Sequence, residues 1–206
     1  MTEEKKKLLA DITEAFLNKG FYKTTMDDIA SELRISKKTI YKFFPTKEAL
    51  VNMIIHGIVF TVRNEFKQVI NQDKSSIEKI IAVSGLFIAR ASKTNVNTIL
   101  EIKKLGPQFW NTIEKLRAKE INANFRKLIE QGQREGYIVP VSVEIIIAVF
   151  IASIQAVINP DFIINNSFSM KQAGEMLLEL FFNGILTDEG KALFKKLKQL
   201  RYEKSF

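Results

Sequence analysis

A run of basic and hydroxyl side chains near the N-terminus, uninterrupted by any acidic residue, has the chemistry needed to bind nucleic acid. The segment 34–42 contains Arg34, Lys37, Lys38 and Lys42, together with the hydroxyl groups of Thr39 and Tyr41. Phosphate oxygens attract the cationic groups, and base edges accept hydrogen bonds from lysine and threonine. A solvated, lysine-rich surface helix would have the same composition, so the neighbouring elements must decide between the two interpretations.

Two short helices with capping signals position this segment. Thr25 is a helix N-cap with Asp28 three positions later, as in a capping box, and predicts a helix over Met26–Leu33. Ser36 is a second N-cap and predicts a helix over Lys37–Phe44, which the following proline ends. Two short helices joined by a tight turn form a helix-turn-helix, whose second helix enters the major groove of DNA. The two capped helices and the turn between them therefore favour DNA binding over a solvated surface helix without a binding role.

The stretch from Gly20 to Leu50, GFYKTTMDDIASELRISKKTIYKFFPTKEAL, resembles the DNA-binding domain of the tetracycline-repressor (TetR) family. The matching elements are Gly20-Phe21, Thr24-Thr25, Ile29-Ala30, Ile35-Ser36, Thr39-Ile40-Tyr41, Phe44 and Lys47-Glu48. This resemblance implies an all-α, homodimeric transcription regulator, usually a repressor, with a ligand-binding C-terminal domain. It also implies a palindromic double-stranded DNA operator as the partner.

Two residues depart from the family's usual pattern. Arg34 and Lys38 stand where the family often has glycine. In the turn, Arg34 is expected to be forced toward left-handed backbone geometry, at a cost of roughly 1–2 kcal/mol. Lys38 adds a cation to the surface that faces DNA, so the family's contact pattern is not expected to transfer unchanged at that position.

Each candidate DNA-binding residue has an expected role. We expect Tyr41 and Lys47 to anchor phosphates, because Lys47 opens the next helix and helix N-terminal amides also bind phosphate. Lys37, Lys38 and Thr39 are expected to face the bases. The complete candidate set is Thr25, Ser36, Lys37, Lys38, Thr39, Tyr41, Lys42 and Lys47.

Composition narrows the function classes. The net charge of +8 suits a polyanionic partner but does not by itself distinguish nucleic acid from an anionic membrane surface. There is no cysteine and only one histidine, His56, so no metal site or cofactor is expected. No catalytic motif appears, and an enzyme is not expected. The apolar run Ile145–Ile158 is shorter than the roughly 20 residues of a membrane span, and the N-terminus lacks a signal segment, which predicts a cytoplasmic soluble protein without a membrane partner.

Hydrophobic periodicity predicts an all-α chain with two domains. Residues 1–50 form a three-helix helix-turn-helix domain, and residues 51–206 form a larger helical domain for ligand sensing and dimerisation. Besides the two short helices, the predicted helices are Glu3–Lys19, Lys47–Asn71, Ser76–Ser92, Val96–Leu105, Pro107–Glu135, Val141–Ile158, Ser169–Gly184 and Thr187–Glu203. Asp161–Phe168 is predicted to be a loop.

The larger domain is predicted to bind a ligand and to dimerise. Its candidate pocket consists of Phe87, Ile102, Leu105, Trp110, Phe125, Phe150 and Gln155, although ordinary core packing would explain the same aromatic set. No lysine or arginine lies among them, which favours a neutral apolar or amphipathic small molecule. Val141–Ile158, which is apolar on nearly every side, should pair with Ser169–Gly184 in a homodimer, so that a charge at Ala152 or Phe181 gives monomers. The alternative is a constitutive architectural DNA-binding protein without a ligand.

Overall fold

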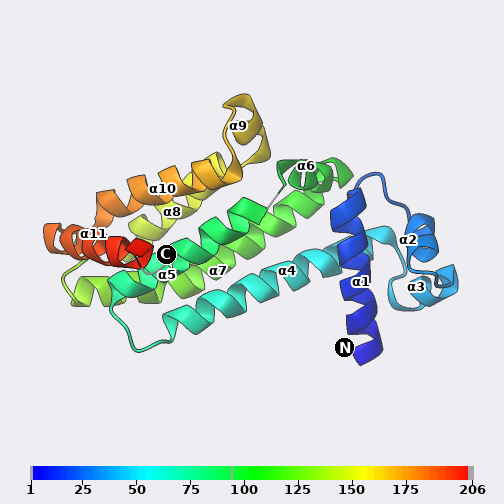
Figure 1. Ribbon diagram of the computed structural model, residues 1–206, viewed down its shortest axis with the longest axis horizontal. Helices are drawn as coiled ribbons and strands as arrows, with labels where there is room; N and C mark the ends of the chain where they lie inside the picture. Colours follow the sequence, from blue (N-terminus) through cyan, green and yellow to red (C-terminus); the bar gives the residue numbers. More distant parts are fainter. Residues whose placement is uncertain (1, 94, 204–206) are drawn as a thin grey trace. The chain divides into compact units, whose positions relative to one another are not determined.

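The computed structural model describes residues 2–93 and 95–203. These residues form eleven α-helices and no strand, apart from an isolated bridge between Ile138 and Leu186. The helices are α1 (Glu3–Lys19), α2 (Met26–Glu32), α3 (Lys37–Phe43), α4 (Lys47–Ile70), α5 (Ser76–Lys93), α6 (Val96–Leu105), α7 (Pro107–Arg134), α8 (Val143–Val157), α9 (Pro160–Asn165), α10 (Met170–Ile185) and α11 (Asp188–Glu203) (Figure 1). The prediction of an all-α fold is confirmed.

The chain forms two compact units. Unit 1 consists of residues Met1–Thr61 and Asn97–Ile113, and unit 2 consists of Val62–Val96 and Glu114–Phe206. The long helices α4 and α7 each contribute residues to both units. Unit 1 thus contains the predicted DNA-binding helices together with α6, which lies much later in the sequence. The division of the chain into domains at residue 50 stays a prediction.

Unit 1 is built around apolar residues from α1, α2, α3 and α4. Its fully buried side chains include Ile12, Phe16, Phe21, Ile29, Ile40, Phe44 and Leu50. Phe16 of α1 stacks on Phe21 with ring centroids 5.0 Å apart. The side chains recur at helical spacing, so each helix has one apolar face that it must bury against the others. This shared core fixes the positions of α2 and α3.

In unit 2, α10 packs against both α5 and α8, and α11 packs against α5 (Figure 1). Four phenylalanines lie at the centre. Phe125 of α7 stacks on Phe150 of α8 at 4.5 Å, and Phe181 and Phe182 of α10 lie 6.1 and 6.3 Å from Phe125. This set is called the phenylalanine cluster below. It joins three helices in one core, because aromatic pairs at these distances stabilise the fold by more than the burial of their apolar surface alone.

One sequence prediction about the chain path was wrong. Residues after Asn159 were expected to form a loop, but Pro160–Asn165 is the short helix α9. The Asn159 side chain accepts a hydrogen bond from the backbone N–H of Asp161, and Pro160 occupies the first turn. Asparagine followed by proline is compatible with the end of a helix, but here Asn159 is an N-cap and Pro160 lies in the first turn, where proline loses no hydrogen bond.

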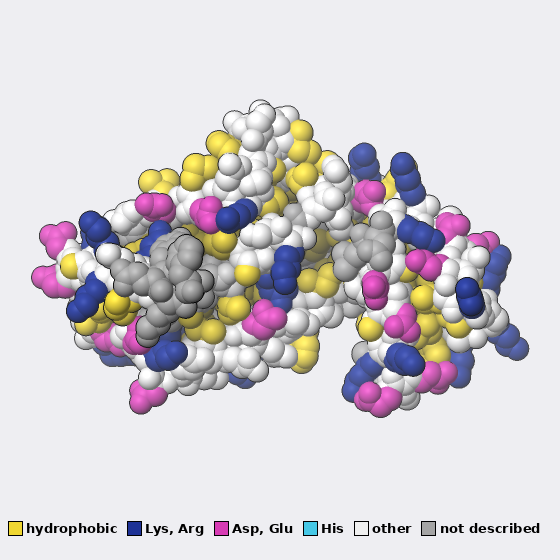
Figure 2. All heavy atoms as spheres, in the orientation of Figure 1, with side chains coloured by type: hydrophobic (Ala, Val, Ile, Leu, Met, Phe, Trp, Pro, Cys, Tyr) yellow, Lys and Arg dark blue, Asp and Glu magenta, His cyan; other side chains and the backbone are white. Residues whose placement is uncertain are grey.

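The helix α8 is not covered on every side within one chain. Ile145 and Val149 are 58% and 52% exposed, and Leu180 of α10 is 77% exposed. Hydrophobic side chains also remain exposed over α9 and α10 in Figure 2. Among the helices that the structure describes, none combines the length and hydrophobicity of a bilayer span.

Candidate nucleic-acid interface

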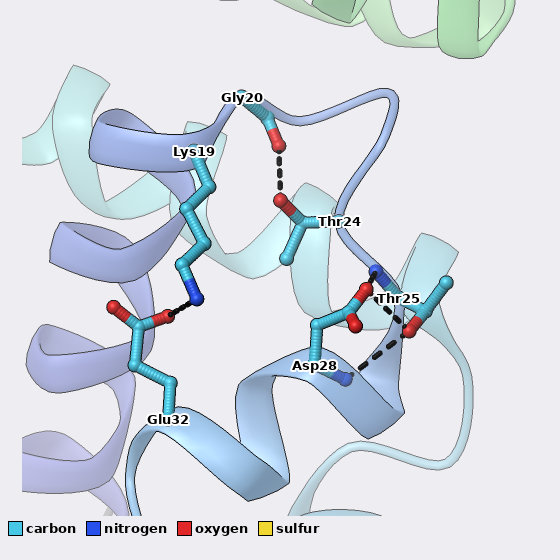
Figure 3. Close-up of polar contacts among 6 residues, drawn as sticks. All are labelled: Lys19, Gly20, Thr24, Thr25, Asp28 and Glu32. Carbon is cyan, nitrogen blue, oxygen red and sulfur yellow. Dashed lines mark hydrogen bonds and ion pairs between the residues drawn. The ribbon is translucent and has the colours of Figure 1, made fainter.

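The two short helices α2 and α3 are each capped by a hydroxyl side chain, as the sequence predicts. Thr25 Oγ1 accepts a hydrogen bond from Asp28 N at 3.1 Å, and Thr25 N donates to Asp28 Oδ2 at 2.8 Å (Figure 3). Thr25 Oγ1 also donates to Asp28 Oδ2 at 2.7 Å, and this hydrogen bond, with the one from Thr25 N, lowers the pKa of the Asp28 carboxyl group. Ser36 Oγ accepts from Thr39 N at 3.1 Å. The hydroxyl groups of Thr25 and Ser36 therefore hold helix termini, and their contact with DNA stays a prediction.

The turn between α2 and α3 places Arg34 in the left-handed region, with φ at 54°. The next N–H, of Ile35, donates to Ala30 O at 3.0 Å and closes the end of α2. This turn brings the start of α3 back beside α2. The expectation that Arg34 takes the place of a glycine in left-handed geometry is confirmed.

Replacing Arg34 with glycine should raise the free energy of unfolding of unit 1. The strain of a side chain in this region is about 1–2 kcal/mol, and the extra freedom of glycine in the unfolded chain offsets about half of it. Urea unfolding should therefore show a net gain of about 0.5–1 kcal/mol. Arg34→Ala is the control, because it removes the side chain while leaving Cβ, and it should bring no gain. A lower midpoint for Arg34→Gly than for Arg34→Ala would contradict this account.

The outward face of α3 presents the predicted cations to solvent. Lys37, Lys38 and Lys42 are exposed, and Tyr41 is 46% exposed, whereas Ile40 is completely buried. Lys42 lies over the ring of Phe43, with its Nζ 4.8 Å from the ring centroid. The burial of Ile40 thus fixes which face of α3 points outward, and this face carries the basic side chains.

Sequence reasoning missed an ion pair on this face. Lys37 Nζ lies 2.5 Å from Asp27 Oδ2 of α2. Because both side chains are exposed, the pair contributes little to stability. It nevertheless holds the Lys37 ammonium group near α2. To contact a base, Lys37 must first break its ion pair with Asp27. Lys38 has no ion-pair partner among the described residues.

Lys47 at the start of α4 is less exposed than the cations of α3. Its Nζ donates to the carbonyl oxygen of Tyr22 at 3.2 Å and lies 5.9 Å from the centre of the Phe16 ring. Burial lowers the pKa of Lys47, against the opposing charges of nearby acidic residues. Lys47 thus ties α4 to the α1–α2 turn, and its predicted contact with a phosphate remains to be measured.

The same turn is held from a second side by a residue that sequence reasoning missed. Glu101 of α6 accepts a hydrogen bond from the backbone N–H of Phe21 at 2.6 Å. Residue 101 lies eighty positions away from residue 21, and no local sequence pattern pairs them. The contact could be found only from the fold.

The predicted ligand-pocket residues fall into different units. Ile102, Leu105 and Trp110 belong to unit 1, and the remaining candidates Phe87, Phe125, Phe150 and Gln155 belong to unit 2. Phe125 and Phe150 lie together in the phenylalanine cluster. Phe87 lies against Gly174 of α10, where it would crowd an added Cβ, whereas Gln155 is exposed. The structure thus brings Phe125 and Phe150 together and leaves Gln155 at the surface.

Charged groups also lie on the helices that carry some of these candidates. In unit 1, Lys103 Nζ lies over the Trp110 ring at 5.6 Å. In unit 2, Arg117 and Glu114 of α7 form an ion pair at 2.9 Å, with side chains only 26% and 14% exposed. Loss of hydration lowers the pKa of Arg117, and Glu114 opposes this effect. An acid and a base three positions apart on a helix were visible in the sequence, and their pairing was not predicted.

A helix-turn-helix with a basic outward face, held in a small helical unit, defines a DNA-binding protein of the transcription-regulator class. Comparison with known proteins agrees. Residues 8–54 match the family model for bacterial regulatory proteins of the tetR family. Residues 8–54 therefore form a DNA-binding domain of the TetR type, and the chain is similar to TetR-family transcriptional regulators.

Relatives and solved structures extend the similarity over most of the chain. The uncharacterized HTH-type transcriptional regulator YvaF of Bacillus subtilis is 24% identical over 185 residues, which are 89% of this chain and 96% of YvaF. A TetR/AcrR-family regulator from Thermobifida fusca superposes with a TM-score of 0.65 at 21% identity, covering 89% of this chain and 98% of that one. FadR from Bacillus subtilis in complex with stearoyl-CoA gives 0.66 at 16% identity, covering 87% and 98%. The two structures show that the fold is shared.

Proposed function

We propose that the protein is a ligand-responsive repressor that binds a palindromic operator as a homodimer and is released by a small molecule. The observation that carries the proposal is the outward face of α3, on which Lys38, Tyr41 and Lys42 are exposed beside a capped helix N-terminus. A repressor of bacterial genes acts where the chromosome lies, so the proposal includes a cytoplasmic location.

The roles proposed for α3 follow from its geometry. The helix N-terminus at Ser36 directs Lys37, Lys38 and Thr39 toward base edges, while Tyr41 reaches a phosphate. Lys38 differs from Lys37 in lacking an ion-pair partner among the described residues, so it needs no exchange before contacting a base. We therefore propose Lys38 as the stronger contributor to sequence preference.

The operator can be found with the purified full-length protein. Fragments of the source genome are incubated with it, bound fragments are sequenced, and the protected region is mapped by footprinting. We expect an inverted repeat with half-sites about 34–36 Å apart or a multiple of that distance. Binding that is equally strong to every fragment would contradict the repressor and favour the architectural protein.

Lys47→Ala should weaken binding to operator and to unrelated DNA by the same factor. Each phosphate contact that a cation makes releases about one counterion, so the slope of log affinity against log salt should fall in magnitude by about one. The measurement is a salt titration of affinity. Lys67→Ala removes an ammonium group from the exposed later part of α4 and is the control, for which the slope should not change. An unchanged slope for Lys47→Ala would contradict its phosphate contact.

The proposed dimer uses the face shared by α8 and α10. A groove of about 370 Å³ runs between these helices, lined by Ile145, Val149 and Leu180 among other apolar side chains. Exposed apolar side chains in one contiguous face are unfavourable in water and are typical of interaction surfaces. A second copy of the chain presents the same face, so a two-fold axis would bury both copies at once. We therefore propose this groove as the homodimer interface.

The ligand proposed for unit 2 is a neutral apolar or amphipathic small molecule near the phenylalanine cluster. Phe87 and the cluster come from α5, α7, α8 and α10, and bring aromatic surface from four helices into one unit. The FadR neighbour, which shares the fold, was solved with stearoyl-CoA, whose acyl chain is apolar but whose CoA part is anionic, so it supports only the amphipathic form of this proposal. Screening by thermal shift should give one compound class that raises the melting temperature in a saturable manner.

Operator and ligand should oppose each other reciprocally. The factor by which the ligand weakens operator binding must equal the factor by which operator weakens ligand binding, and about 1–3 kcal/mol is typical of such coupling. A ligand bound equally well with and without operator would refute the release mechanism. The close ring stacking of Phe125 on Phe150 also suits a packed core. A screen without any specific compound would therefore favour the constitutive DNA-binding protein.

A further inference from the structure

The peptide group between Gly20 and Phe21 is held on both sides. Its N–H donates to Glu101 Oε2 at 2.6 Å. Its carbonyl oxygen, that of Gly20, accepts from Thr24 Oγ1 at 2.6 Å (Figure 3). Gly20 has φ at 95°, and a Cβ at this position would overlap the Glu101 carboxylate. The Glu101 side chain therefore lies directly against the backbone of the turn, and both hydrogen-bonding groups of this peptide are occupied.

The turn leads directly into the helices that face DNA. Thr24 is 3% exposed and is followed by Thr25, whose side chain caps α2. Two residues after the Gly20 carbonyl, the carbonyl of Tyr22 accepts the hydrogen bond from Lys47 of α4. The turn is thus held by a carboxylate from α6 on one side and an ammonium group from α4 on the other.

We propose that Glu101 is a positioning residue for operator binding: by fixing the α1–α2 turn, it sets the start of α2 and the place of Lys47. The inference rests on the proposed function, since it assumes that unit 1 binds an operator. Glu101 does not touch DNA in this account, and its carboxylate would repel phosphates if it did. Its effect reaches DNA through the backbone of residues 20–25.

Removing the carboxylate should lower operator affinity. In Glu101→Ala the Phe21 N–H loses its acceptor, and the turn is free to adopt other conformations. Only molecules whose turn has the conformation described above then bind the operator, and the apparent affinity falls in proportion to the fraction of molecules in that conformation. We expect a loss of about tenfold, which corresponds to one such hydrogen bond. Glu101→Gln keeps an oxygen acceptor at the same reach and should bind within about twofold of the unchanged protein.

Hydrogen exchange distinguishes positioning from a purely structural role. When operator fixes the turn, the hydrogen bond to Glu101 should slow amide exchange in α6 as well as in α2 and α3. This operator-dependent slowing at α6 should persist in Glu101→Gln and disappear in Glu101→Ala, while the slowing at α2 and α3 remains. A purely structural role would change the exchange rates of the free protein but not the response to operator.

The control is Glu14→Ala, which removes an exposed carboxylate of α1 that makes no hydrogen bond or ion pair among the described residues. It should leave operator affinity and amide exchange in α6 unchanged.

All measurements use the full-length protein and a fragment obtained by genomic selection. If Glu101→Ala binds as tightly as the unchanged protein, or if α6 does not respond to operator, the inference is wrong. If the unchanged protein selects no fragment, the proposed function itself fails, which is a separate result.

Discussion

Replacing Leu180 with glutamate is expected to convert the proposed dimer into a monomer and to abolish operator binding at concentrations where the unchanged protein is saturated. Leu180 is 77% exposed in one chain and lines the groove between α8 and α10. In the proposed dimer it is buried, and an unpaired carboxylate cannot be buried in an apolar contact without a large cost. Dimerisation should weaken by at least about a hundredfold, or about 2.7 kcal/mol. Sedimentation velocity over a concentration series measures this change.

The control for this variant is Glu179→Lys on the same helix. Glu179 is the exposed neighbour of Leu180 and does not line the groove, so its variant should remain dimeric. Thermal unfolding must show that Leu180→Glu keeps its helices. A dimer of unchanged strength in Leu180→Glu would exclude the groove as the interface and leave its apolar lining for another partner.

Phe181 is unsuitable for the same test, although the sequence suggested it. It is only 8% exposed, and its ring lies 4.6 Å from Phe150 in the phenylalanine cluster. A charge at Phe181 would therefore disrupt the core of unit 2 before it reached an interface. Ala152 is exposed on α8 and can serve as a second position at which to place a charge.

Gly20→Ala should strongly destabilise unit 1. Its φ of 95° is a conformation that L-residues rarely adopt, and the new Cβ would displace the Glu101 carboxylate from Phe21 N–H. The backbone strain costs about 1–3 kcal/mol, and the lost hydrogen bond costs about as much again. We expect a loss of about 3 kcal/mol in the free energy of unfolding, measured by urea titration.

A double-variant cycle separates the two contributions. In the Glu101→Ala background the carboxylate is absent, so Gly20→Ala should cost only the backbone strain, about 1.5 kcal/mol. The coupling between the two sites should therefore be about 1–2 kcal/mol. Additive effects, with no coupling, would show that the Glu101 side chain moves aside freely and that its hydrogen bond contributes little.

Helix positions were predictable because capping residues and apolar spacing are local signals. Thr25, Ser36 and Ser169 each accept the capping hydrogen bond expected from their type. The predicted helix Val96–Leu105 has the same bounds in the structure, and most others differ by one or two residues. The exception is α9, where one residue pair, Asn159-Pro160, is compatible with both a helix end and a helix start.

The sequence indicated which residues of the candidate interface are exposed, but not which side chains they contact. Burial of Ile40 follows from its spacing, and it leaves Lys38 and Lys42 exposed as expected. The pairing of Lys37 with Asp27 and of Glu101 with the Phe21 N–H depends on how helices are placed in three dimensions. The sequence alone does not show which helices lie next to one another, so these two contacts could be identified only in the structure.

The position of α6 has a consequence for building hybrid regulators from members of this family. The segment that the family model matches ends at residue 54, and this would be the natural place to join the DNA-binding part of one protein to the remainder of another. Unit 1, however, also contains Asn97–Ile113, and Glu101 supplies the acceptor for a backbone N–H in the transferred part. A hybrid that exchanges only residues 1–54 would keep its recognition helix but lose its own α6. If Glu101 positions the turn as proposed, we expect transfer of operator preference at full affinity to require an acceptor at position 101, or an exchange of both segments together.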